Sequence, residues 1–302
     1  MGEPASLPRK RWRRVDGVLL LDKPRGMTSN DALQKARRLF SAEKAGHTGT
    51  LDPLADGLLP LCFGEATKFS SDLFDADKTY EAEIRLGQRT DTADAEGQVI
   101  AERPVTVDES AVREALNRFR GTIDQVPPMY SALKRDGRPL YELARQGIEV
   151  ERAARRVTLH ALDLLAIDLP LLRVRVTCSK GTYIRSLADD LGEVLGCGAH
   201  LTALRRTEVG GLDVATALTL DALAGIAEER RADVLAPVDS LVQLLPRVDL
   251  DGSLAERFRL GNAVACPIPV EERFRVYDQH HFLGVGIRDP RGLLQPKRVM
   301  RL

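Results

Sequence analysis

The sequence has no long apolar segment, no paired cysteine motif and no net charge. Every hydrophobic run falls short of the roughly 18 residues that a membrane-spanning helix needs, so we expect no association with a membrane. The formal net charge of +0 means that a nucleic-acid partner would have to be bound by local basic patches. The four cysteines are scattered without a C-x-x-C pair, which favours reduced thiols in a cytoplasmic protein over a disulfide framework or a zinc site: Cys62, Cys178, Cys197 and Cys266.

Several ligand-binding signatures are also missing. There is no P-loop, no G-x-G-x-x-G after a strand and no convincing metal-ligand cluster, so we expect neither a cofactor nor a metal ion. There are no internal repeats, no low-complexity regions and no coiled-coil heptads, so the sequence points to no obligatory protein partner and leaves the oligomeric state open. The 302 residues are enough for one large domain plus a small one.

Hydrophobic patterning predicts an α+β protein in two parts. Residues 1–16 contain a basic cluster and are expected to form a disordered arm ahead of a larger unit over 17–240. Pro237 and Pro246 indicate a linker before a small β-rich unit at 250–302, whose basic end makes it a candidate nucleic-acid binder. Strands are expected at 18–21, 80–86, 156–166, 172–178 and 200–207, and helices at 30–40 (capped by Ser29 or Asn30), 108–119, 218–226, 254–260 and from Tyr183 onward.

One short segment, GHTGTLDPLADG at 46–57, concentrates carboxylates, hydroxyls, an imidazole and glycines. Its glycines permit positive φ and the close approach of a ligand to the backbone. Pro53 fixes its own φ and biases Asp52 away from the helical region, so that this carboxylate sits at a stiff, extended corner. Spacing alone favours a purely turn-forming role for Asp52, and a second turn at Asp56-Gly57, because Asp and Gly are usual turn residues.

Residues 127–156 combine basic and aromatic side chains. Such a stretch is typical of RNA-binding surfaces, where aromatic rings stack on bases. Acidic residues are interspersed through it, so an ordinary solvated surface is an equal alternative. The basic and aromatic members are Lys134, Arg135, Arg138, Arg145, Arg152, Arg155, Arg156, Tyr130 and Tyr141, and the acidic ones are Asp136, Glu142, Glu149 and Glu151.

Four segments, taken in order, resemble the TruB-type tRNA pseudouridine synthases, which isomerise a uridine in the T loop of tRNA. They are LLDKPRGMTS at 20–29, GHTGTLDPLA at 46–55, PPMYSALK at 127–134 and CSKGTYIR at 178–185, and residues 89–97 and 198–206 strengthen the match. The resemblance covers residues 17–210 well. It implies a catalytic domain of pseudouridine-synthase type over 17–240, with a mixed, mainly antiparallel sheet. The size, position and β content of 250–302 suggest the family's PUA-like RNA-binding domain.

The resemblance also assigns roles to individual residues. It makes Asp52 the catalytic carboxylate, Arg185 the cation that holds it ionised, and Tyr80 the ring that stacks on the target base and is a candidate for the C5 proton step. Whether Asp52 attacks the sugar, attacks the base or takes a ribose proton stays open. The base is expected to be flipped out of the T loop. The implied substrate-binding residues are His47, Lys23, Tyr183, Lys180 and Leu204, with His47 positioning RNA, Leu204 forming an apolar wall, and the lysines contacting the RNA backbone.

Two alternatives compete with this interpretation. A noncatalytic RNA-binding protein on the same fold would most simply have lost Asp52 or Arg185, and both are present. A carboxylate-based glycosidase acting on nucleosides would need a second positioned carboxylate, for which Asp56 is available, but its basic surfaces would be unexplained. We therefore expect an isomerase that acts on the T arm of tRNA.

Overall fold

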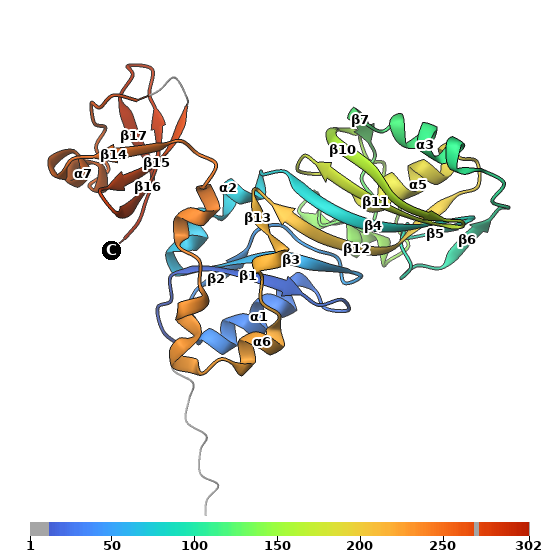
Figure 1. Ribbon diagram of the computed structural model, residues 1–302, viewed down its shortest axis with the longest axis horizontal. Helices are drawn as coiled ribbons and strands as arrows, with labels where there is room; N and C mark the ends of the chain where they lie inside the picture. Colours follow the sequence, from blue (N-terminus) through green and yellow to red (C-terminus); the bar gives the residue numbers. More distant parts are fainter. Residues whose placement is uncertain (1–11, 269–271, 302) are drawn as a thin grey trace, which may run out of the picture.

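The computed structural model describes residues 12–268 and 272–301, and one large mixed sheet dominates it (Figure 1). Within these residues the sheet has nine strands, and all its pairings are antiparallel except that of β12 with β3. Across the sheet the order is β1 (Gly17–Lys23), β3 (Ala55–Phe63), β12 (Ala199–Val209), β4 (Lys78–Leu86), β11 (Leu171–Cys178), β10 (Arg155–Asp168) and β7 (Gly121–Gln125), while β2 (Ala45–His47) pairs with β3 and β13 (Leu212–Asp213) pairs with β12. The predicted α+β class and mixed, mainly antiparallel sheet are confirmed.

Both faces of β3 are covered, which explains its continuous apolar sequence. Leu59 and Leu61 belong to the main core, whereas Leu58 and Cys62 belong to a second cluster on the opposite face. The main core is closed by α1 (Ser29–Phe40), α3 (Glu109–Asn117) and α5 (Ile184–Val194), each of which buries one apolar stripe. In Figure 1, α3 and α5 lie together at one end of the sheet, and α1 with α6 (Leu220–Gly225) lies at the other.

Helix α1 begins one residue earlier than the sequence suggested. The side chain of Thr28 accepts a hydrogen bond from the backbone N–H of Asp31, so Thr28 is the N-cap residue and the proposed caps Ser29 and Asn30 lie inside the helix. Ser29 is buried, and its hydroxyl contacts Leu51 instead. The serine hydroxyl is thereby available to support the segment that carries Asp52.

The C-terminal unit is a four-stranded sheet with one helix. Its strand order is β14 (Arg247–Leu250), β15 (Arg273–Asp278), β16 (His281–Arg288) and β17 (Leu294–Val299), and α7 (Gly252–Arg259) packs on it. Phe258 and Phe274 are fully buried between helix and sheet. Strand β14 pairs in parallel with β15, and its four residues were too few for sequence patterning to identify.

The expected linker between Pro237 and Pro246 is a packed element. It forms the 3-10 helix η4 (Val238–Val242), whose Val238, Leu241 and Val242 are buried in the second cluster. Val285 of β16 belongs to the same cluster, so this short helix joins the two sheets instead of separating them. The sequence pattern missed this helix because the flanking prolines, Pro237 and Pro246, indicated a linker, although three of its residues are apolar and become buried.

The prediction of a disordered arm over 1–16 is wrong for residues 13–16. Residues 1–11 lie outside the described part of the chain, but Arg13 pairs with Ala42 and its N–H donates to the carbonyl of Ser41 at 2.7 Å. Val15 is buried, and Asp16 accepts a hydrogen bond from the backbone N–H of Glu65. Residues 13–16 are thus part of the folded unit, because they find partners on α1 and beyond β3.

The remaining described elements are short. They are α2 (Ser70–Phe74), β5 (Gln88–Thr90), β6 (Val99–Glu102), β8 (Lys134–Arg135), β9 (Arg138–Pro139), α4 (Leu140–Ala144) and the 3-10 helices η1 (Gly64–Lys68), η2 (Val214–Thr216) and η3 (Glu228–Val234). Among the described helices, none has the length and apolar character needed to cross a membrane.

Candidate active site

A cavity of about 540 Å³ opens beside strands β4 and β12. The loop after β2, the segment around Ser131 and the turn into α5 complete its wall. It brings together six of the eight residues singled out from the sequence, although they come from four separate parts of the chain: Asp52, Tyr80, Lys180, Tyr183, Arg185 and Leu204.

The loop that carries Asp52 is anchored on both sides. The hydroxyl of buried Ser29 accepts a hydrogen bond from the N–H of Leu51 at 2.8 Å and donates to the carbonyl of the same residue at 3.0 Å. The N–H of Gly26 donates to the carbonyl of Pro53 at 2.7 Å. Helix α1 and the turn before it therefore hold the backbone on either side of Asp52, which gives its carboxylate a defined position.

Asp52 and Arg185 form an ion pair in this cavity. Nη2 of Arg185 lies 3.0 Å from Oδ2 of Asp52, and the arginine side chain is 5% exposed while that of Asp52 is 39% exposed. Nε of Arg185 lies 3.6 Å from Oδ2 of Asp94, whose side chain is 5% exposed. One buried guanidinium therefore faces two carboxylates, and of the two Asp52 is the one that a ligand can reach.

Arg185 is placed by the first turn of α5. Buried Gln125 on β7 anchors this turn, because its amide exchanges hydrogen bonds with the N–H and the carbonyl of Tyr183 at 2.8 and 3.0 Å. A cation in the first turn opposes the helix dipole, and here two carboxylates compensate it. Nη2 of Arg185 also donates to the carbonyl of Tyr130 at 2.7 Å, which connects the basic segment 127–156 to the site.

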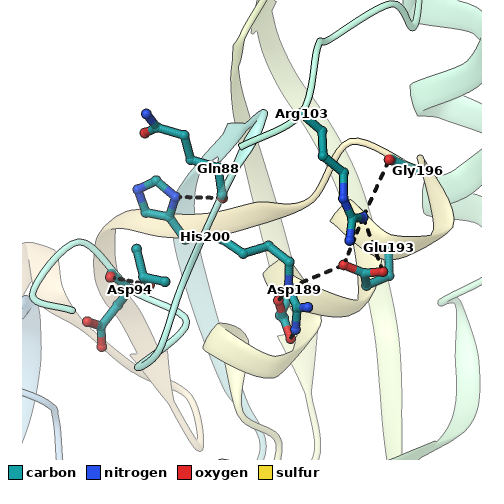
Figure 2. A network of polar contacts seen from close by, with 9 residues as sticks. Gln88, Asp94, Arg103, Asp189, Glu193, Gly196 and His200 are labelled. Carbon is teal, nitrogen blue, oxygen red and sulfur yellow. Dashed lines mark hydrogen bonds and ion pairs between the residues drawn. The ribbon is translucent and has the colours of Figure 1, made fainter. Parts of the chain in front are cut away.

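Figure 2 shows the polar contacts that fix α5 to the strand before Asp94. Arg89 on β5 binds Asp189 on α5 through both carboxylate oxygens, at 2.7 and 2.9 Å. Arg89 and Arg103 each lie 3.2 Å from Glu193, one turn further along the same helix. The helix that carries Arg185 and the strand that leads to Asp94 are thus held against each other by a network of ion pairs.

The loop that carries Asp94 is attached to β12 as well. Leu201 exchanges backbone hydrogen bonds with Ala93 and Ala95, and the hydroxyl of Thr90 donates to the carbonyl of Asp94 at 2.7 Å. His200 contacts the carbonyl of Gln88 through Nδ1 at 3.0 Å (Figure 2). Asp94 therefore reaches Arg185 from a loop that is hydrogen-bonded to β12, and its carboxylate lies near Nε of the guanidinium while Asp52 contacts Nη2.

Four side chains from two paired strands form one face of the cavity. Lys78 and Tyr80 alternate along β4, and Leu204 and Arg206 alternate along β12, with Arg206 opposite Tyr80 in the register. Burial raises the pKa of the Tyr80 phenol, so it is neutral at physiological pH. Burial lowers the pKa of Lys78 to about 8. The wall next to Asp52 thus combines an aromatic ring, an apolar side chain and two buried basic side chains that donate to backbone carbonyls.

Two residues expected in the site do not line the cavity. Lys23 is completely buried, and its ammonium donates to the carbonyls of Pro24 and Met27 at 2.9 and 2.7 Å. A contact with an RNA backbone is therefore not available to it in this structure. His47 lies on β2, where burial, helped by nearby Arg206, lowers its pKa and leaves the imidazole neutral at physiological pH.

Asp56 does not line the cavity that contains Asp52. It lies on β3 instead of in a second turn, and its carboxylate pairs with Arg205 at 2.6 Å. Arg205 also binds Asp22 at 2.8 Å, and these three residues line a separate hollow of about 740 Å³. The second carboxylate that a glycosidase would require is therefore absent from the Asp52 cavity at this position. The described residues contain no cluster of three or more metal-ligating side chains.

Sequence reasoning missed Arg206 and Asp94 as parts of the site. Arg206 is 1% exposed, and its Nε donates to the carbonyl of Leu58 at 2.8 Å. Both residues fall within segments that carried the family resemblance, but nothing local distinguishes a buried arginine in a strand from a surface one. Alternation with Leu204 along β12 was the one available signal.

Models of known protein families match nearly the whole chain. Residues 37–184 match the model of the TruB family pseudouridylate synthase N-terminal domain. Residues 185–243 match that of the tRNA pseudouridylate synthase B C-terminal domain, and residues 246–300 match the C-terminal domain of pseudouridine synthase II TruB.

Curated relatives and solved structures agree with these matches. The chain is 60% identical over 294 residues to the tRNA pseudouridine synthase B of Dechloromonas aromatica, covering 97% of this chain and 98% of that one. It is 61% identical over 299 residues to the enzyme of the same name from Burkholderia lata, covering 97% and 92%. A chain in the structure of an H/ACA RNP bound to a substrate RNA containing 2′-deoxyuridine superimposes with a TM-score of 0.73 at 25% identity, covering 95% of this chain and 85% of that one.

Proposed function

Because the chain belongs to the TruB family of tRNA pseudouridine synthases, which are isomerases, we propose that it converts a uridine in the T loop of tRNA to pseudouridine with Asp52 as the catalytic carboxylate. The observation that carries the proposal is the ion pair of Asp52 and Arg185 in a cavity large enough for a base. Asp52 is accessible, and its partner is buried. This combination supplies a charged group that is both reachable and held in place.

The reaction breaks the N1–C1′ bond, rotates the base and joins C5 to C1′. The proton leaves C5, and the product gains one at N1, so the net change is an isomerisation and no redox partner is consumed. Asp52 supplies the ionised carboxylate beside the ribose and base. The same carboxylate position serves attack on the sugar, attack on the base or removal of a ribose proton, and these three routes stay open.

Tyr80 would stack on the uracil, with Leu204 as the apolar wall beside it. Its phenol stays protonated at physiological pH, since burial raises its pKa, so the ring presents a neutral face and an O–H that can exchange protons. Arg185 pairs with Asp52, and Asp94 balances the remaining positive charge of the guanidinium. Arg206 lies next to Tyr80 as a second buried cation.

A uridine inside a folded loop must be extruded to reach Asp52, at a cost of a few kcal/mol. Cations around the cavity, among them Lys180 and the exposed Arg155 and Arg156, would hold the flanking phosphates. The four-stranded C-terminal unit is the proposed PUA-like RNA contact. The cytoplasm, where thiols stay reduced, fits the four free cysteines of this chain.

The proposed activity is tested by tritium release from C5-labelled uridine in a T-arm RNA. Wild-type protein should release one tritium per target uridine without added cofactor, because the C5 proton must leave when C5 joins C1′. The matched control is the same RNA with the label in a stem uridine. Tight binding without release would instead favour the noncatalytic RNA-binding alternative.

Reversing Arg155 and Arg156 to glutamate should weaken T-arm binding and flatten its dependence on salt. Each lost phosphate contact removes about 0.7 to 0.9 from the slope of log affinity against log salt concentration. The measurement is a titration of labelled RNA at several salt concentrations. The control for net charge is reversal of Arg113 on α3 and of Arg118 directly after it, which pair with Glu109 and Glu114. An unchanged slope would show that Arg155 and Arg156 do not contact phosphates of the RNA.

A further inference from the structure

The rim of the Asp52 cavity carries an exposed aromatic side chain. Phe74 ends α2, lines the cavity and is 55% exposed, whereas its neighbour Leu73 is 3% exposed and packs in the second hydrophobic cluster. Helix α2 is therefore anchored in the core through Leu73 while it presents Phe74 outward. A phenyl ring that stays largely in water does not gain the stabilisation that burial would supply, so Phe74 contributes little to the stability of the fold.

The backbone below the ring is held firmly. The ammonium of Lys78 donates to the carbonyl of Phe74 at 2.7 Å and lies 6.0 Å from the ring centroid. The next residue, Asp75, pairs with Lys180 at 2.8 Å, which connects the end of α2 to the turn that precedes α5. Two polar contacts thus connect this corner of the cavity rim to β4 and to the turn before α5.

The charges around Phe74 indicate what it contacts. Lys78, Lys180, Arg155 and Arg156 line the same cavity, and the last three are exposed. A flat apolar ring among cations fits a nucleic-acid base on its phosphate backbone, since aromatic rings stack on bases and cations hold phosphates. Tyr80, which is less exposed, lies on the cavity wall, whereas Phe74 is exposed at the rim, so a base stacked on Phe74 would belong to a different nucleotide from the one at Asp52.

We propose that Phe74 is a stacking platform for a nucleobase adjacent to the target uridine in the substrate RNA. This inference rests on the proposed function, because it requires the target uridine to occupy the Asp52 cavity. The ring would hold the neighbouring base out of the loop and thereby align the target nucleotide. Phe74 is thus a positioning residue for RNA that touches no reacting atom.

The test is a double-mutant cycle between Phe74 and the RNA. Phe74→Ala should weaken binding of a T-arm RNA and raise KM by about 10-fold, the lower part of the range measured for stacked bases, while kcat changes little. Phe74→Leu should show most of the same loss because it keeps the apolar volume without the π face, and Phe74→Trp should bind at least as well as wild type. Ile100→Ala, at a 58% exposed position on β6, controls for loss of surface apolar area.

The coupling is measured with T-arm RNAs that are abasic at the nucleotide on the 5′ or the 3′ side of the target. With wild-type protein, one of the two abasic RNAs should bind about 10-fold more weakly than the intact RNA, and Phe74→Ala should weaken its binding no further. The abasic position in that RNA then identifies the stacked base. Equal losses from Phe74→Ala on all three RNAs, or no loss on the intact RNA, would overturn the proposal. If wild-type protein releases no tritium from the intact RNA, the proposed function fails, whereas normal release without coupling refutes only the role of Phe74. Unchanged thermal unfolding of the variants excludes a folding defect.

Discussion

Asp52→Asn is expected to reduce C5-tritium release by on the order of 10⁴-fold or more, while the affinity for T-arm RNA changes only slightly. Asparagine keeps the shape of the side chain and its place in the loop held by Ser29, but it carries no charge and no nucleophilic oxygen. Each of the three open routes needs that charge. The measurement is single-turnover release at saturating enzyme, which separates chemistry from binding.

The matched control for this prediction is Asp56→Asn. Asp56 lies four residues further along the chain, is about as exposed as Asp52 and also pairs with an arginine, but it lines a different hollow. Its replacement should leave tritium release within a few-fold of wild type. If Asp52→Asn kept wild-type turnover, or if the Asp56 variant lost as much activity, the assignment of the catalytic carboxylate would be wrong.

Arg185→Ala is expected to cost both activity and stability. The variant leaves Asp94, whose side chain is 5% exposed, without its cation, and an uncompensated buried charge of this kind costs about 3–5 kcal/mol. It also frees Asp52 from its 3.0 Å contact, so the carboxylate loses its orientation. Chemical denaturation measures the free energy of unfolding, and tritium release measures the activity.

A second substitution separates the two effects. Arg185→Ala combined with Asp94→Asn should regain part of the lost stability, since the unpaired charge is gone, but none of the activity. Arg185→Lys keeps the charge without the fork that reaches both carboxylates, so it should be intermediate in both measurements. An Arg185→Ala variant as stable and as active as wild type would contradict the role of the buried guanidinium. Arg113→Ala, at an exposed ion pair on α3, is the control.

Much of the fold could be predicted because local patterns and family motifs agree. Alternation along β4 and β11 and the apolar stripes of α1 and α5 correspond to the observed elements, and the α+β class is confirmed. The errors fall where a residue's partner lies far away in the chain. Ser29 was taken for a cap because it begins a helix, and its buried contact with Leu51 depends on packing between distant segments.

The candidate site divides in the same way. The family resemblance was sufficient to select Asp52, Tyr80 and Arg185, although spacing alone favoured a turn role for Asp52, and the fold brings the three residues to one cavity. It was insufficient for Asp94 and Arg206, whose burial results from the pairing of β12 with β3 and β4 and from the loop bound to Leu201. Lys23 shows the opposite case, since its position in a motif suggested an exposed contact and the fold buries it completely.

The sequence by itself determined the family, the order of the longer helices and strands and the residue types available for chemistry, because these depend on local periodicity and on motifs read along the chain. The tertiary structure alone decided which charges meet. Arg185 binds Asp52 and Asp94 at once because a helix end, a strand-bound loop and a loop clamped by Ser29 converge on one point. Burial and partnership are properties of that convergence, and no single segment contains them.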